Sequence, residues 1–227
     1  QYGRTILIRG NILLNDDIFQ ETERAFAAAV VDSQAHDLTP EGGFYRTLWH
    51  EIGHYCGVDI TADGRDLDSA LQDSADLYEE MKADLVSLTS ARILHDRGKL
   101  SDEQLRAIYA SGIRRVLQKN KPRRDQPYQT MQLMQWNWFM DKGALHFENG
   151  RLRIDYARYP AAVESLLHEV LAIQRNGDHA AANAFVDRWT SWRTDLHEVI
   201  AHNMRASERT RFALVTYAAV PGPNAAR

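Results

Sequence analysis

Residues 47–55 read Thr-Leu-Trp-His-Glu-Ile-Gly-His-Tyr and contain the pattern His-Glu-x-x-His. On a helix, His50 and His54 lie about 40° apart around the axis and one turn apart along it, so both imidazoles can reach one metal ion. Zinc accepts neutral imidazole and keeps a fourth position open for water when the protein supplies three ligands. Glu51 can take a proton from that water. The stretch therefore predicts a helix that carries a catalytic zinc, the alternative being a chance pattern on a polar helix face.

A third protein ligand is expected from a second helix that packs across the first. Residues 79–84 read Glu-Glu-Met-Lys-Ala-Asp, which places Glu80 and Asp84 on one helix face. A buried carboxylate pair is costly without a cation, whereas one carboxylate can bind zinc while the other accepts a hydrogen bond from a ligating histidine. We predict Glu80 as the third ligand, with Glu79 as the alternative. An exposed acidic helix edge is the competing interpretation.

The remaining sequence predicts a mainly helical domain. Apolar residues at helical spacing favour helices over residues 16–31, from 40 through the histidine motif, 67–95, from 101 through 116, 128–142, 160–175 and 179–207. The long segment 67–95 is expected to be amphipathic, and the tryptophans are expected to lie in the core.

Two β elements are also expected. Residues 5–10 have the β-branched, apolar character of a short strand, and residues 145–155 alternate around Asn149-Gly150, a hairpin signal. On the histidine helix, Phe44, Leu48 and Ile52 share one face, which we expect to press into the core.

Composition limits the class of protein. A chain of 227 residues with 44% hydrophobic residues can bury a full core, and we predict one domain over residues 1–227 with a flexible tail over 218–227. Acidic and basic residues are interspersed and the net charge is −4, which argues against nucleic-acid binding. The single cysteine excludes an internal disulfide framework, and no apolar run approaches the roughly 20 residues of a membrane span.

The chain starts at Gln1 rather than methionine, and no signal peptide is visible. We therefore expect a cytoplasmic protein, or a fragment of a longer chain from which an upstream segment has been removed.

A second histidine pair needs a separate assessment. His197 and His202 flank Glu198 but lie five residues apart, about 140° apart on a regular helix. They could share a metal only across a helix bulge, so we do not expect a metal site there.

Together, the segments 50–54 and 79–84 resemble the dipeptidyl peptidase III family of zinc peptidases. The resemblance is closest to the branch found as a peptidase-like domain fused to Nudix hydrolases in plants. It extends from about residue 3 to about residue 190 and includes four further similar segments, over residues 3–10, 137–144, 162–166 and 172–177.

This resemblance implies a mainly α domain similar to the zinc-bearing lobe of that family. It implies one zinc per chain with His50, His54 and Glu80 as ligands, and Glu51 as general base. Asp84 would orient a ligating histidine. Apart from the resemblance, we expect Glu79 to lie next to the ligands if it is not itself the third one.

Three departures from the family limit what can be carried over. The family peptidases space their histidines one residue further apart. Tyr128 stands where the family has a histidine thought to stabilise the transition state, so its hydroxyl would have to donate to the oxyanion. The family's other lobe, which anchors the peptide's N-terminus, has no counterpart here, so dipeptidyl specificity is not implied.

We therefore predict a zinc-dependent hydrolase, a metallopeptidase that cleaves short peptides and lacks an N-terminal substrate-binding lobe. Nucleic-acid and membrane partners are not expected. The alternatives are a non-catalytic, metal-stabilised binding or regulatory domain of a larger protein, and a zinc hydrolase with a non-peptide substrate.

Overall fold

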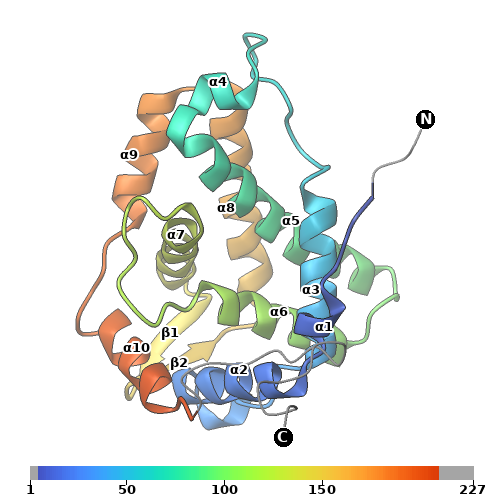
Figure 1. Cartoon of the computed structure of the whole chain (residues 1–227), viewed down its shortest axis with the longest axis vertical. Coiled ribbons are helices and arrows are strands. Elements are labelled where there is room, and N and C mark those ends of the chain that lie inside the picture. Colours follow the sequence, from blue (N-terminus) through green and yellow to red (C-terminus); the bar gives the residue numbers. More distant parts are fainter. Residues whose placement is uncertain (1–4, 210–227) are drawn as a thin grey trace, which may run out of the picture.

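The computed structural model describes residues 5–209, with α5 (Ala75–Asp96) at the centre of the helices (Figure 1). Helix α5 contacts α3 (Pro40–Gly53), α6 (Asp102–Val116), α7 (Pro127–Asp141) and α8 (Tyr159–Asn176). These neighbours bury all five consecutive residues from 81 to 85, so every face of the helix is covered there. The expectation of an amphipathic helix over 67–95 was wrong, because helices from distant parts of the chain cover the faces that the pattern would leave to solvent.

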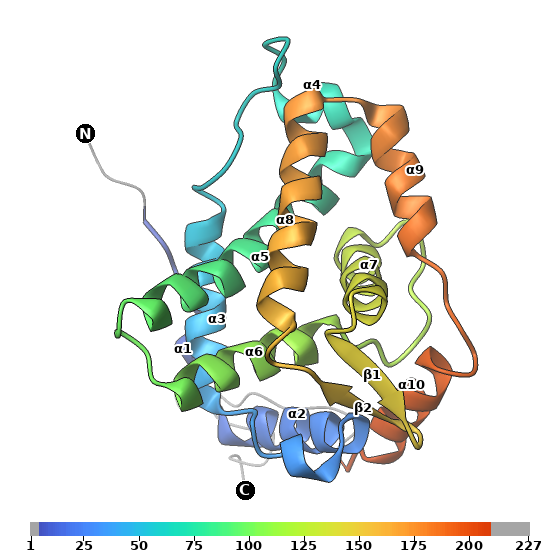
Figure 2. The ribbon, with the colours of Figure 1, turned by 180° about the vertical axis from the view of Figure 1, so that it is seen from behind.

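Seen from behind, α8 lies across α5, and the β-hairpin lies at the end of the molecule near α2 and α10 (Figure 2). The remaining elements are α1 (Gly10–Leu13), α2 (Asp16–Ala29), α4 (Leu67–Leu71), α9 (His179–Trp189), α10 (His197–Ala206) and the short 3-10 turns η1 (Asp32–Gln34) and η2 (Gln72–Ser74). The mainly helical fold class is confirmed.

The predicted hairpin is confirmed as β1 (Leu145–Glu148) and β2 (Arg151–Ile154), paired antiparallel with Leu145 opposite Ile154. Its turn residues Asn149 and Gly150 have φ values of 52° and 79°, the left-handed conformations that a tight two-residue hairpin turn requires.

The strand expected over residues 5–10 is wrong. Residues 5–9 form no regular structure, and Leu7 is 88% exposed. A strand needs a neighbour, and the free edge of β2 is already covered: Val31 N donates to Leu152 O, and the Gln34 amide both donates to and accepts from the backbone of Ile154.

Two expected helices are each divided in the structure. The segment 67–95 breaks after α4, where Gln72 takes a φ of 53°. The segment 179–207 breaks between α9 and α10, where Asn137 Nδ2 donates to the carbonyls of Trp189 at 2.8 Å and Ser191 at 2.9 Å. These two bonds satisfy the carbonyls of the last residue of α9 and of a residue just after it. They replace the helical hydrogen bonds that these carbonyls would otherwise accept.

Helix α3 begins as predicted, with Thr39 accepting a hydrogen bond from Gly42 N and Pro40 in the first turn. Its inward face differs from the prediction. Phe44, Leu48 and Ile52 are only partly buried, and the buried residues of the helix are Gly42, Arg46, His50 and Gly53.

Two glycines explain this orientation of α3. A Cβ atom on Gly53 would lie 2.9 Å from the carbonyl oxygen of Ala83 in α5, and one on Gly42 would lie 2.6 Å from the backbone of Ala107 in α6. Because neither glycine has a side chain, α3 approaches both helices closely. The close approach directs Arg46 and His50 into the interior, against α5.

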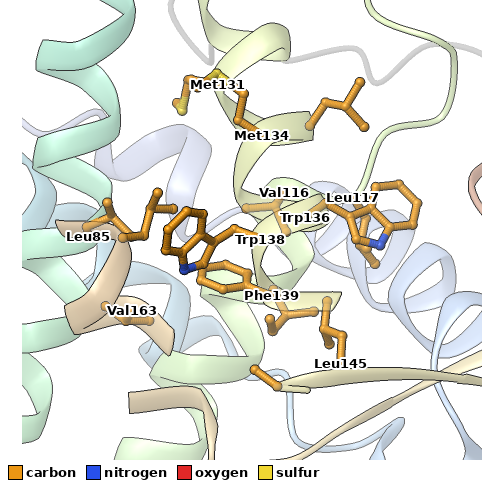
Figure 3. Packing of buried hydrophobic residues seen from close by; sticks show 14 of the residues in the cluster. Leu85, Val116, Leu117, Met131, Met134, Trp136, Trp138, Phe139, Leu145 and Val163 are labelled. Atoms are coloured by element: carbon orange, nitrogen blue, oxygen red, sulfur yellow. The ribbon is translucent and has the colours of Figure 1, made fainter. Parts of the chain in front are cut away.

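The apolar core gathers around α7. Trp138 of this helix lies on the side of Leu85 of α5 and Val163 of α8, and Trp136 lies on the opposite side of α7 (Figure 3). Burying each such large side chain contributes about 1.5–3 kcal/mol. The core therefore fixes α7 and α5 relative to each other, and these helices carry Tyr128 and Glu80.

No helix within residues 5–209 is long and apolar enough to cross a membrane. The expected tail, residues 218–227, lies outside the described residues.

Candidate metal centre

The end of α3 and the second turn of α5 bring three ligand-type side chains together. His50 Nε2 and His54 Nε2 are 3.2 Å apart. Glu80 Oε2 lies 3.3 Å from His50 Nε2, and Glu80 Oε1 lies 3.9 Å from His54 Nε2. Among residues 5–209, these three form the one group of histidine, cysteine and carboxylate side chains with ligand atoms converging at this range.

Two of these separations fit a tetrahedral zinc, and the one between His54 and Glu80 is longer. Zinc bonds to nitrogen and oxygen are about 2.0–2.2 Å long, so two ligand atoms at the tetrahedral angle are about 3.3 Å apart. The contact between the two Nε2 atoms matches this value. Without a cation, the two imidazoles can share at most one linear N–H···N hydrogen bond. Glu80 adds a negative charge beside them, so the cluster suits a bound cation.

Each histidine also has a carboxylate beside its other nitrogen. Asp84 Oδ1 lies 2.8 Å from His50 Nδ1, although the angle at this contact is not that of a hydrogen bond. Glu79 Oε1 lies 3.1 Å from His54 Nδ1. Carboxylates in this position fix the tautomer that leaves Nε2 free to bind a metal. Glu79 therefore lies next to Nδ1 of His54, on the side of the ring away from the converging Nε2 atoms. This position favours Glu80 over Glu79 as the third ligand.

Asp84 is almost completely buried, at 3% exposure, and is paired on several sides. Arg46 Nη1 donates to Oδ1 at 3.0 Å, and Arg115 Nε lies 2.8 Å from both carboxylate oxygens. Burial alone would raise the pKa of Asp84, but the neighbouring Arg115, His50 and Arg46 together hold that pKa far below its ordinary value. Asp84 is therefore an anion at neutral pH, as a partner of a ligating histidine must be.

The ionisation of the neighbouring groups follows from the same contacts. Burial disfavours the charged form of His50, but the carboxylates of Asp84 and Glu80 outweigh it, so the pKa of His50 lies above its ordinary value. Burial would raise the pKa of Glu80, but His50 and Tyr128 outweigh it and lower that pKa. Burial lowers the pKa of Arg46 to about 10, which leaves it charged at neutral pH.

Sequence reasoning missed three residues of this centre. Arg46 precedes His50 by four residues on the same helix face, a spacing that could have revealed it. Arg115 comes from α6 and carries no local signal. Lys82 is 2% exposed and donates to the carbonyl of Cys56 at 2.7 Å, while its Nζ lies 2.7 Å from Glu79 Oε1. Lys82 thus ties the end of α3 to the carboxylate behind His54.

Tyr128 and Glu51, the two predicted catalytic residues, differ in their contacts. Tyr128, in the first turn of α7, donates its hydroxyl to Glu80 Oε1 at 2.9 Å, and this bond raises the pKa of Tyr128. Glu51 is partly exposed and has no hydrogen bond or ion pair to any residue from 5 to 209. Within those residues, its carboxylate is therefore not held by another side chain.

The second histidine pair does not converge. His197 is buried, stacks on Trp192 and accepts a hydrogen bond at Nδ1 from Arg193 N, and burial lowers its pKa to about 4. His202, on the same helix α10, is exposed. The pair is thus split between the core and the surface.

The fold and the cluster together define a helical domain with a candidate three-ligand metal centre. Its structure resembles that of dipeptidyl peptidase III from Corallococcus sp. strain EGB, with a TM-score of 0.76 and 25% identity over 86% of this chain and 37% of that one. It also resembles dipeptidyl peptidase III from Caldithrix abyssi, with a TM-score of 0.74 and 23% identity over 87% of this chain and 37% of that one.

In sequence, the chain is 29% identical over 177 residues to Nudix hydrolase 3 of Arabidopsis thaliana. The match covers 75% of this chain and 23% of the plant protein. No model of a known protein family matches the chain. The resemblance to dipeptidyl peptidase III is confirmed, and the chain spans well under half the length of the relatives it matches.

Proposed function

We propose that this chain is a zinc-dependent hydrolase that cleaves amide bonds in short peptides. The observation that carries the proposal is the convergence of ligand atoms from His50, His54 and Glu80 within 4.8 Å of one another, with a carboxylate beside the other nitrogen of each histidine. The structural likeness to two proteins named dipeptidyl peptidase III supports a peptide as the substrate.

In this proposal, zinc held by His50, His54 and Glu80 would supply a Lewis acid for the scissile carbonyl and would lower the pKa of a water to about 7. Glu51 takes the proton from that water and passes it to the leaving amine. Asp84 and Glu79 keep His50 and His54 in the tautomer with Nε2 unprotonated. The Tyr128 hydroxyl turns from Glu80 and donates to the carbonyl oxygen as that oxygen gains negative charge.

The main alternative is a structural zinc in a non-catalytic domain. Structural zinc sites are almost always closed by four protein ligands, whereas catalytic sites keep one position open. The convergent group within the described residues contains three candidate ligands, which favours the catalytic assignment.

The shared regions amount to 37% of each peptidase chain. We propose that the substrate is a short peptide held over the metal centre, and that a further substrate-binding lobe, where present, is supplied from outside residues 1–227.

The proposal is tested by digestion of a peptide library with the purified chain, before and after removal of metal by a chelator. We expect cleavage that the chelator abolishes and that stoichiometric zinc restores. Cleavage that persists in the metal-free protein, or no cleavage of any peptide by the fully zinc-loaded protein, would reject the hydrolase.

A second test concerns the carboxylate behind His50. Asp84→Asn keeps the size of the side chain but removes the charge that fixes the His50 tautomer, so zinc affinity should fall about 10- to 100-fold. The measurement is a competition titration against a zinc-binding dye. His54 keeps Glu79, so zinc binding should weaken without being lost. Unchanged affinity would show that Asp84 serves only to pair Arg46 and Arg115.

A further inference from the structure

A second feature adjoins the metal centre: a cavity of about 550 Å³ between α3, α6 and the start of α7. Thr47 and Arg46 of α3, Arg114 and Arg115 of α6, and Gln129 of α7 form parts of its wall. Thr47 precedes Glu51 by four residues, so their side chains are neighbours on one helix face, with Cβ atoms about 6 Å apart. The cavity thus begins one helical turn from the proposed general base.

The wall of this cavity is basic. It includes Arg46, Arg114, Arg115 and Lys119, and among residues 5–209 no aspartate or glutamate lines it. Asp84 is shared between Arg46 and Arg115, and Glu208 pairs with Lys119. Within the described part of the chain, these two carboxylates are fewer than the four basic side chains, and neither of them pairs with Arg114.

Arg114 is the least satisfied of these basic side chains. Its Nε is buried and has no hydrogen-bond partner among residues 5–209, and no ion pair to the described carboxylates involves its guanidinium. Burial without an anion lowers the pKa of Arg114 below its ordinary value. A guanidinium that is partly buried without an anion is destabilised, and its planar donors match a carboxylate in two-point contact.

We infer that this cavity binds a carboxylate of the peptide substrate, with Arg114 as the residue that pairs with it. The inference rests on the proposed function, since it takes the substrate to be a peptide. The cavity is also lined by neutral hydrogen-bond donors, including Gln129. They can donate hydrogen bonds to the peptide carbonyl groups next to that carboxylate. An acidic side chain and a free C-terminus both present the required group.

Binding is tested with three blocked amino acids that need no hydrolysis. N-acetylglutamine amide carries no charge, N-acetylglutamate amide carries a side-chain carboxylate, and N-acetylglutamine carries a terminal carboxylate. Titration followed by NMR should show about 10- to 100-fold tighter binding of a carboxylate probe than of the neutral one, the range of a charge-assisted hydrogen bond. The tighter of the two acidic probes identifies the source of the carboxylate.

Arg114→Gln should bring the ratio of acidic to neutral affinities close to one. Because Arg114 is partly buried and its replacement could disturb the fold, a second variant is needed. Gln129 is exposed, and Gln129→Glu should lower the same ratio by adding a negative charge to the wall. The matched control is Arg123→Gln, which removes the same charge from an exposed side chain that does not line the cavity. That control should keep the ratio of the unmodified chain.

Equal binding of all three probes, or a ratio that neither variant changes, would overturn the inference. The outcome is separable from that of the digestion. Zinc-dependent hydrolysis with no preference for carboxylates rejects the carboxylate site and leaves the hydrolase in place. Selective binding without hydrolysis keeps the carboxylate site and rejects the hydrolase.

Discussion

The double substitution His50→Ala, His54→Ala should reduce bound zinc from near one equivalent per chain to background. It removes two of three candidate ligands and leaves Glu80 alone, and a single carboxylate cannot retain zinc against dialysis. The Nε2 atoms of the two imidazoles are 3.2 Å apart, and they are the only nitrogen ligands in the converging group within residues 5–209. The measurement is metal analysis of the dialysed protein by mass spectrometry.

The control for this experiment removes two histidines that lie elsewhere. His168 and His202 are both exposed, so His168→Ala, His202→Ala changes the histidine content equally and should leave zinc in place. Circular dichroism checks that both double variants remain helical. Near-stoichiometric zinc in the folded His50→Ala, His54→Ala protein would reject the site.

Local geometry explains why the candidate ligands could be predicted from the sequence. Two residues four apart on a helix share a face whatever surrounds them, so the pairing of His50 with His54 needed no knowledge of the fold. The same holds for Glu80 and Asp84 on α5. That α3 and α5 cross at these residues was inferred from the need for a third ligand, and the resemblance to known peptidases supported it.

The surroundings of the ligands could not be predicted in this way. Phe44, Leu48 and Ile52 suggested an apolar inward face for α3, but the close contacts of Gly42 and Gly53 turn that helix so that its polar residues face α5. A hydrophobic pattern records which side chains favour burial, and it does not record how closely two backbones can approach.

Elements that depend on distant neighbours were also mispredicted. Residues 5–9 have strand-like composition, but the Gln34 side chain and Val31 backbone already cover the hairpin edge. Arg115 reaches Asp84 across 31 positions of sequence, and no local pattern links the two. Charge pairing in the interior thus depended on the packing of α6 against α5.

The substitution Glu51→Gln should lower peptide hydrolysis by about 10²–10⁴-fold, the value of general-base chemistry, while the zinc content stays unchanged. Glutamine has nearly the same size as glutamate but cannot accept the proton of the water at neutral pH. Glu51 is outside the converging ligand group, so no ligand is lost. The measurement is the turnover of one library peptide by the two proteins at matched zinc content.

Glu41→Gln is the matched control, because it neutralises a carboxylate in the first turn of the same helix, away from the ligands. Its turnover should equal that of the unmodified chain. A catalytic zinc and a structural zinc predict different results here: the first requires a base and loses turnover with Glu51, whereas the second has no turnover to lose. Equal turnover by Glu51→Gln and the unmodified chain would mean that another group removes the proton. Because Glu51 has no other interaction with residues 5–209, such a result could not be explained by a compensating structural change at Glu51.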